Sequence, residues 1–327
     1  MSDTAPKYTE CYVAFLDILG FGEFVARSQD EPELLEQMVL ALNEVATTTS
    51  PEAVRRDSTS GELKHWTVQV RAFSDSIFLF IPTESLLVPH FLSAVRRLFY
   101  LVLEMGFCLR GGVTIGSMYW SDAWCQSPRK QDASESEKKT GEVEIYRRFG
   151  RTDLPIALGK GLIEAYTLEN SVAVYPRIVI GDKLFTHMKG FENGENQGNS
   201  SSFPLCNSTS DGTYPKITEF VRNDFDGVRF LDVLHPRMNH TDVTRKAVAK
   251  PSQSETVHSA EMNVVTRKQR LKSVRASITR AMASATDSRV RMKYDWFANY
   301  FNETLSRDTD EGLNLVEPIP MTTEDSE

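Results

Sequence analysis

The sequence predicts an α+β fold, in which an antiparallel-rich sheet is covered on one face by helices. Two apolar runs, at residues 8–17 and 107–116, have the length and composition of buried strands. Two segments with helical apolar spacing and a short hairpin lie between these runs. The order of strand, helix, hairpin, helix and strand is typical of an antiparallel sheet with helices packed against it.

The first strand is followed by a tight turn and a helix. The strand ends at Asp17, and the Gly20-Phe21-Gly22 turn leads into a helix that we expect to begin near Glu23. Further along, apolar residues recur at helical spacing, at Leu34, Leu35, Met38, Leu42 and Val45.

A hairpin with an acidic residue at its turn comes next. We expect strands over 65–73 and 76–81, with Asp75 between them. A second helix is predicted over 84–105, because apolar residues lie on one side of it at Leu87, Phe91, Val95, Leu98 and Val102. The strand at 107–116 contains glycines that permit another backbone to approach closely. Together these elements have the order of a ferredoxin-like palm.

The second half of the chain is less regular. A charged insertion at 126–148 precedes a predicted helix over 154–169 and a short strand over 177–180. An Asn/Gly/Ser-rich segment follows at 192–213, and two more helices are expected between residues 261 and 300.

These patterns divide the chain into three parts. The first is a globular domain over residues 8–185, and the second is an extension with helices over residues 186–306. The third part, residues 307–327, is acidic and contains proline, so we expect a disordered tail.

The composition argues against several classes of protein. A net charge of -8 disfavours a general nucleic-acid binder and a protein that binds anionic membranes. The N-terminus has no apolar signal core, and charges such as Arg96 and Arg97 interrupt the long apolar stretches. Cys11 and Cys108 lie in apolar runs and no CxxC pair is present, so we expect buried thiols and a cytoplasmic location.

Two acidic residues lie at the ends of apolar strands. Asp17 ends the first strand, and Asp75 lies at the hairpin turn. A charge in such a segment has a high free-energy cost unless it has a partner. If the two strands are neighbours, the carboxylates lie together and can bind a divalent cation, whose shell substrate phosphates would complete. The alternative is that Asp17 caps the following helix and Asp75 is an ordinary turn residue.

Glycines and arginines near these aspartates suit an anionic substrate. Gly20 and Gly22 precede a helix whose N–H groups could bind phosphate, although a simple tight turn would have the same pattern. Arg71, shortly before Asp75, could contact a base edge or a phosphate, or it could face solvent. Arg110 is flanked by apolar residues and glycines, and it could contact substrate or form a structural ion pair.

As a set, these segments resemble the class III nucleotidyl cyclases. Their first metal motif is similar to FLDILGF at residues 15–21, and their second to RAFSDS at 71–76. Their glycine-containing strand resembles LRGGVTIG at 109–116, and their late catalytic helix resembles LGKGLIEAYTLE at 158–169. Together with KYDWFANYFN at 293–302, these segments look most like the Pycsar cyclases of bacterial anti-phage defence.

The resemblance implies a class III cyclase palm with a C-terminal extension, acting as a homodimer with its active sites at the interface. It also implies that Asp17, Asp75 and the backbone carbonyl of Ile18 bind two Mn²⁺ or Mg²⁺ ions. The substrate phosphates would then lie near Phe21 and Gly22.

The resemblance implies a pyrimidine nucleoside triphosphate, UTP or CTP, as the substrate. We favour UTP, because an arginine near the base suits the acceptor-rich edge of uracil. Arg71 stands where adenylyl cyclases read a purine with lysine. The cyclic product would act on a separate effector protein. Ile163 and Thr167 stand where purine cyclases have Asn and Arg, so we expect Arg110 or a residue of the second subunit to meet the transition-state charge.

Two other functions fit the same fold. One is a catalytically silent nucleotide sensor. The other is a palm-type nucleotidyltransferase that acts between molecules and needs an acceptor groove, and the negative net charge disfavours a nucleic-acid acceptor.

Overall fold

The computed structural model describes most of the predicted strands and helices. The described residues are 7–47, 54–56, 63–65, 68–83, 87–120, 156–192, 216–235, 242–245, 262–265, 267–307 and 316–321. The charged insertion predicted at 126–148 lies outside these ranges, as does nearly all of the Asn/Gly/Ser-rich segment at 192–213.

A mostly antiparallel sheet organises the fold. Within the described residues it has eight strands, in the order β4-β5-β1-β6-β8-β10-β9 with β7 beside β6. Only the pair of β6 and β8 is parallel among the described pairings of this sheet. The strands are β1 (Thr9–Leu19), β4 (Gln69–Phe73), β5 (Ser76–Pro82), β6 (Cys108–Trp120), β7 (Ala157–Leu158), β8 (Ile178–Ile180), β9 (Val221–Asn223) and β10 (Arg229–Leu231).

Two short hairpins and a set of helices complete the described structure. The hairpins pair β2 (Val54–Arg56) with β3 (Leu63–His65) and β11 (Asp242–Arg245) with β12 (Met262–Val265). The helices are α1 (Phe21–Asp30), α2 (Pro32–Thr47), α3 (Val88–Glu104), α5 (Lys160–Ser171), α6 (Asp182–Glu192), α7 (Arg267–Ser284) and α8 (Ser288–Arg307), with a short 3₁₀ helix at Ile217–Phe220. This mixture of helices and antiparallel strands agrees with the predicted α+β class.

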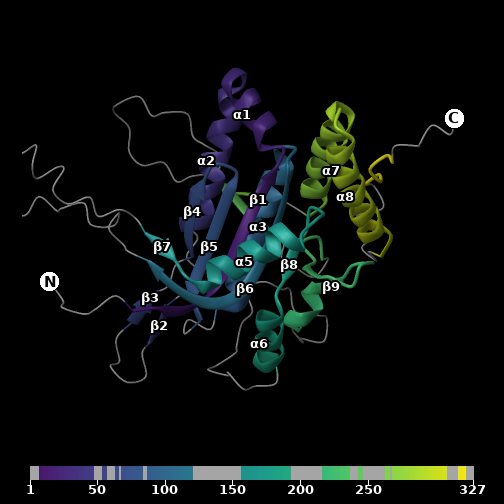
Figure 1. Cartoon of the computed structure of the whole chain (residues 1–327). Helices are drawn as coiled ribbons and strands as arrows, with labels where there is room; N and C mark the ends of the chain where they lie inside the picture. The colour runs from purple at the N-terminus through teal and green to yellow at the C-terminus, as the bar shows by residue number, and fades with distance from the viewer. Residues whose placement is uncertain are drawn as a thin grey trace, which may run out of the picture.

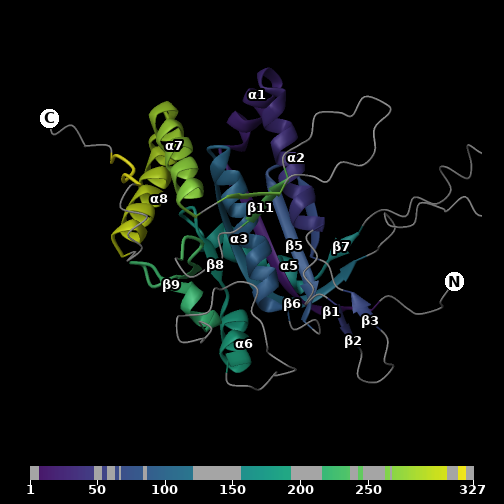
Figure 2. The same ribbon diagram turned by 180° about the vertical axis from the view of Figure 1, so that it is seen from behind.

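Helices cover both faces of the sheet, so the prediction that they cover one face is wrong. Figure 1 shows α5 in front of the central strands, and Figure 2 shows α3 on the opposite face. Along β1, Tyr12, Ala14 and Leu16 join the core on the α3 side. The alternate residues Cys11 and Val13 pack with α5 on the other side. The physical reason is that β1 is apolar on both faces, as is typical of a central strand covered on both sides.

Glycines explain why α5 lies so close to β6. A Cβ atom at Gly112 would lie 2.4 Å from Cβ of Leu168, and one at Gly116 would lie 2.5 Å from Cα of Gly161. The close approach expected at the glycines of this strand is therefore the docking surface of α5. Helix α5 begins at Lys160, later than the predicted start at residue 154, because Ala157–Leu158 pairs with β6 as β7.

The predicted C-terminal extension shares the main core. Its two expected helices are present as α7 and α8, and they contribute Leu271, Val274, Ile278, Phe297 and Phe301 to the hydrophobic cluster that contains α3. The predicted boundary at residue 185 falls inside α6.

Part of the predicted disordered tail packs against this helical pair. Val316 and Ile319 are buried in the same cluster. The side chain of Asn302 accepts a hydrogen bond from the Ile319 N–H group and donates one to the Ile319 carbonyl. Residues 316–321 are therefore held in place by α8, which the acidic composition does not predict.

Two expectations from composition concern the cysteines and the membrane-spanning potential of the helices. Cys11 and Cys108 are buried free thiols, as predicted. None of the helices in the described ranges combines the length and apolar character that a membrane span requires.

Candidate active site

The sheet brings Asp17 and Asp75 together. Strand β1 pairs with β5 so that Asp17 lies opposite Ser76, the residue after Asp75. The backbone N–H of Ile18 donates a hydrogen bond of 3.0 Å to the carbonyl oxygen of Asp75. The two predicted metal ligands are therefore neighbours at the end of β1, where the hairpin turns.

The hairpin turn itself has an unusual backbone. Ser74 has φ 56°, in the left-handed region that residues other than glycine rarely adopt. The Ser76 hydroxyl lies 3.4 Å from Oδ1 of Asp75. The turn thus fixes Asp75 close to Asp17 through its backbone rather than through an ion pair.

Arg110 pairs with Asp17 across the sheet. The two residues are opposite each other in the register of β1 and β6, and Nε of Arg110 donates a hydrogen bond of 2.9 Å to Oδ2 of Asp17. The same nitrogen lies 2.8 Å from Oε1 of Glu169 on α5. The ion-pair interpretation of Arg110 is therefore confirmed, and a role in the transition state stays a prediction.

Glu169 is a buried acid that the sequence reasoning did not single out. Its side chain is 4% exposed. Its Oε1 accepts no hydrogen bond from the described residues, because the Nε–H group of Arg110 is directed at Asp17. Burial raises the pKa of the Glu169 carboxyl, and the charges of Asp17 and Asp75 add to this while Arg110 opposes it. No local pattern separates Glu169 from the partly exposed Glu164 on the same helix.

Lys293 on α8 is a second group that the sequence reasoning assigned no role. Burial lowers the pKa of its ammonium group, and so does the positive charge of Arg110. The negative charges of Asp17 and Glu169 act in the opposite direction. The charges of Asp17, Arg110 and Glu169 therefore all act on the Lys293 ammonium group.

The turn after β1 presents backbone N–H groups beside the aspartates. Gly20 is the N-cap of α1 with φ 81°, a conformation that favours glycine. The N–H groups of Glu23 and Phe24 donate to the Gly20 carbonyl. Those of Phe21 and Gly22 come earlier in the first turn, where a helix leaves its N–H groups without an internal partner. All three predicted phosphate-binding residues, Gly20, Phe21 and Gly22, therefore lie at one helix end.

Arg71 lies on the same face of the sheet as Asp17, but at a distance from it. Arg71 is opposite Phe78, which is opposite Phe15, and Phe15 and Asp17 are two positions apart on one strand. This register puts Arg71 about 10 Å across the strands and about 7 Å along them from Asp17. Its Nη1 donates to the carbonyl of Val70 at 2.9 Å. Arg71 could thus contact a part of a substrate remote from the metal ligands.

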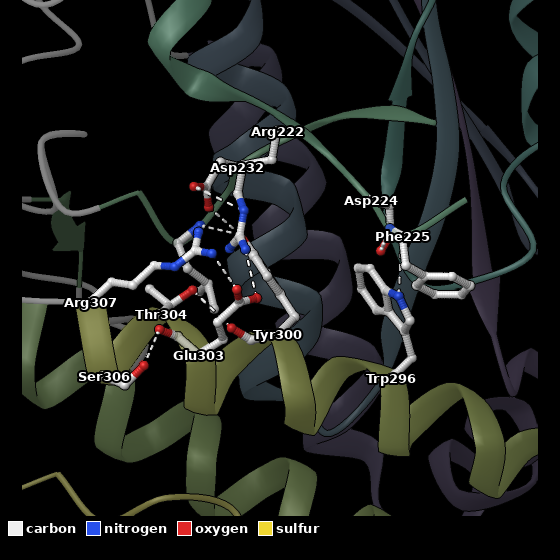
Figure 3. A network of polar contacts seen from close by, with 11 residues as sticks. Arg222, Asp224, Phe225, Asp232, Trp296, Tyr300, Glu303, Thr304, Ser306 and Arg307 are labelled. Carbon is white, nitrogen blue, oxygen red and sulfur yellow. Dashed lines mark hydrogen bonds and ion pairs between the residues drawn. The ribbon is translucent and has the colours of Figure 1, made fainter. Parts of the chain in front are cut away.

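A separate polar network joins α8 to β9 and β10. Figure 3 shows Arg222 between Asp232 and Glu303, and Trp296 beside Asp224. The Tyr300 hydroxyl donates to Asp232 at 2.5 Å. A cavity of about 500 Å³ adjoins this network and is lined by Arg222, Asn223, Asp224, Phe225, Phe230, Trp296, Asn299, Tyr300, Glu303 and Arg307. These contacts fix helix α8 against the segments that carry β9 and β10.

The metal-binding capacity of the site depends on few protein ligands. In the described part of the chain, no cluster of three or more His, Cys, Asp or Glu side chains is arranged to hold a metal ion. Asp17 and Asp75 would therefore need oxygen atoms from a substrate to complete a coordination shell.

Comparison with known proteins leaves the family open. The sequence matches no protein-family model and no curated protein. The motifs of the chain and the geometry of Asp17, Asp75 and their neighbours are therefore the basis for a proposed function.

Proposed function

We propose that this protein is a metal-dependent nucleotidyl cyclase. It would convert a pyrimidine nucleoside triphosphate, UTP in preference to CTP, into a 3′,5′-cyclic nucleotide and diphosphate. The observation that carries the proposal is the 3.0 Å bond from the Ile18 N–H group to the Asp75 carbonyl, which sets two aspartates side by side next to the N-terminus of α1.

The strand order supports this proposal. Strands β4, β5, β1 and β6 are adjacent in that order, with helices between β1 and β4 and between β5 and β6 in the chain. This order is the one expected for a ferredoxin-like palm, the fold that the resemblance to class III cyclases implies. The added strands β8, β10 and β9 extend the sheet beyond β6.

The carboxylates have oxygens to offer to Mg²⁺ or Mn²⁺. Oδ2 of Asp17 accepts from Arg110 and Oδ1 of Asp75 lies near the Ser76 hydroxyl, so each keeps one oxygen without a hydrogen bond from the described residues. In an antiparallel pair, the N–H and C=O groups of one residue point to the same neighbour, so the Ile18 carbonyl points to the Asp75 side. When bound, the two ions would activate the ribose 3′-hydroxyl and neutralise the departing diphosphate.

The remaining residues would hold the substrate. The N–H groups of Phe21 and Gly22 would donate to phosphate oxygens, because a helix N-terminus favours anions. Arg71 would donate to the carbonyl oxygens of the base, which are more numerous on uracil than on cytosine. Arg110 would hold the Asp17 carboxylate in a fixed orientation through its hydrogen bond to Oδ2.

An exposed apolar surface supports a homodimer with the site at its interface. Phe73, Ile163 and Tyr166 are 81%, 66% and 48% exposed, and they lie on the α5 side of the sheet that carries Asp17. A second copy of the chain would remove this apolar area from water. The cyclic product would leave the dimer and act on a separate effector in anti-phage defence, as the family resemblance implies.

The second candidate function is a catalytically silent nucleotide sensor. The observation that favours it is that Arg110 is already engaged by two carboxylates, while Ile163 on α5 is apolar and the Thr167 hydroxyl donates to the Ile163 carbonyl. A sensor would bind a nucleoside triphosphate and release no cyclic product.

Incubation of the purified protein with UTP, CTP, ATP and GTP in the presence of Mn²⁺ separates the two functions. A cyclase forms a 3′,5′-cyclic nucleotide and diphosphate in equal amounts, and the Asp75→Ala variant forms neither. A sensor gives no product with the unmodified chain. A linear dinucleotide would indicate the intermolecular transferase instead.

A further inference from the structure

We propose that Lys293 of helix α8 binds the substrate phosphates in the candidate active site of its own chain. This inference rests on the proposed function, and it assigns to the C-terminal helical pair a direct part in substrate binding. Neither the two aspartates nor the turn after β1 supplies a positive charge for a triphosphate.

The position of α8 explains how its lysine reaches the site. Strand β8 pairs with β6 only from Gly111 to Val113, so no described strand lies along Cys108–Arg110 on that side. The Tyr294 hydroxyl donates a buried hydrogen bond of 3.2 Å to the carbonyl of Gly106, just before this segment. Helix α8 thus covers the start of β6. Lys293 directly precedes Tyr294, the residue that makes this contact.

The figures place the same helices around one end of the sheet. In both Figure 1 and Figure 2, α7 and α8 lie on one side of the end from which α1 emerges, and α1 and α2 lie on the other. The phosphate-binding turn at Gly20 begins α1. A triphosphate held at Asp17 would therefore have the α1 turn on one side and α8 on the other.

The arginine nearest to Asp17 is already engaged. Arg110 contacts Asp17 and Glu169 at 2.9 and 2.8 Å, and Arg71 lies two strands away from Asp17. Lys293, by contrast, is half-buried and makes no ion pair or side-chain hydrogen bond with the residues that the structure describes. Lys293 is thus a half-buried cation that the charges of Asp17 and Glu169 influence and that has no ion pair among the described residues, so its charge is available to a ligand.

The motif around Lys293 holds it in place. Trp296 donates to Asp224 at 3.1 Å, and Tyr300 bonds to both Asp232 and the Leu234 N–H group. Figure 3 shows Trp296 beside Asp224, with Tyr300 on the same side of α8. Aromatic residues of the segment at 293–302 make these contacts, and Lys293 takes no part in them. Since α8 is fixed at several points, the Lys293 ammonium needs little ordering when a phosphate binds.

Binding of inorganic triphosphate in the presence of Mg²⁺ tests the inference without requiring turnover. The dissociation constant is measured by calorimetry for the full chain and for Lys293→Met, Lys293→Arg and Lys272→Met, the last of which changes an exposed lysine on α7. We expect Lys293→Met to weaken binding at least about tenfold, because a charge-assisted hydrogen bond is lost. Lys293→Arg and Lys272→Met should stay within about twofold of the unmodified chain.

Two results would overturn the assignment: unchanged triphosphate binding by Lys293→Met, or no binding by the unmodified chain. Uridine, which has no phosphate, serves as a second probe, and its affinity should be the same for the unmodified chain and Lys293→Met. A loss of uridine binding would mean that Lys293 supports the fold of the site instead. Failure of the cyclase proposal is recognised separately, as normal triphosphate binding without any cyclic product from the unmodified chain.

Discussion

The Nε–H group of Arg110 donates a hydrogen bond of 2.9 Å to Oδ2 of Asp17, and this pair lies directly across the central strands β1 and β6. The contact holds a proposed metal ligand in a fixed orientation. Arg110 also contacts Glu169, so that one largely buried cation lies between two acids.

Replacement of Arg110 by methionine should destabilise the fold. Asp17 and the buried Glu169 would lose their shared cation, and removing one partner of a buried ion pair lowers the free energy of unfolding by about 3 kcal/mol or more. Urea denaturation measures this change. The matched control is Arg289→Met on the exposed start of α8, for which a change below about 0.5 kcal/mol is expected. Equal stability of the two variants would contradict the structural role of Arg110.

A methyl group at Gly112 should displace α5. Its Cβ would lie 2.4 Å from Cβ of Leu168 and 2.5 Å from the carbonyl oxygen of Ala165, contacts that the packed helix cannot relieve without moving. We expect Gly112→Ala to lower the free energy of unfolding by about 3 kcal/mol. Thermal unfolding of this variant can be compared with Gly22→Ala, because a Cβ at Gly22 meets no atom within 4 Å. Gly22→Ala should be neutral or stabilising, since alanine favours a helix.

The buried acid of the α8 network gives a prediction for pH. Burial raises the pKa of the Asp232 carboxyl, against the opposing effects of the Tyr300 hydrogen bond and Arg222. The folded state therefore holds this proton more tightly than the unfolded state, and the contribution of Asp232 to stability falls as the pH rises above about 4.

Asp232→Asn should remove this effect while still accepting the hydrogen bond of Tyr300. The free energy of unfolding of the variant, relative to the unmodified chain, is expected to increase from pH 4 to pH 7 in denaturation curves. A difference that is constant over this range, or that decreases, would contradict the account of the buried carboxyl.

Arg71 should influence the choice of base. It lies on the edge strand β4, on the face of Asp17 but two strands away, where the base of a nucleotide bound at the aspartates could reach it. Arg71→Lys should alter the ratio of product formed from UTP to that formed from CTP, because lysine cannot make the bidentate contact of a guanidinium. Product ratios in mixed-substrate assays measure this change. An unchanged preference among the four triphosphates would remove Arg71 from the base-binding role.

Local sequence patterns predicted the central part of the fold well. The strands around Asp17 and Arg110, the hairpin at Asp75 and the one-sided helix α3 all have periodic apolar residues that fix their type. The apolar spacing of α5 itself does not show that this helix lies on the far face of the sheet. That position is instead indicated by β1, which is apolar on both faces, and by the glycines of β6.

The candidate site was only partly predictable, because its residues come from distant parts of the chain. Asp17 and Asp75 could be paired because each ends a recognisable strand. Glu169 and Lys293 reach the site on helices whose docking depends on tertiary contacts, such as the bond from Tyr294 to Gly106, and no local pattern encodes those contacts. Arg110 was recognised as unusual, but its partners follow only from the register of β1 and β6 and from the position of α5.

The formation of cyclic nucleotide by aspartate variants tests the central claim most directly. UTP and Mn²⁺ are supplied to the unmodified chain, to Asp17→Asn, to Asp75→Asn, and to Asp182→Asn as a control for an exposed aspartate on α6 that pairs with Arg229. The account predicts 3′,5′-cyclic UMP from the unmodified chain and the control. It predicts a loss of about 100-fold or more for each of the other two variants, which corresponds to the several kcal/mol that metal ions contribute to a transition state. Undiminished cyclic product from Asp17→Asn or Asp75→Asn would contradict it.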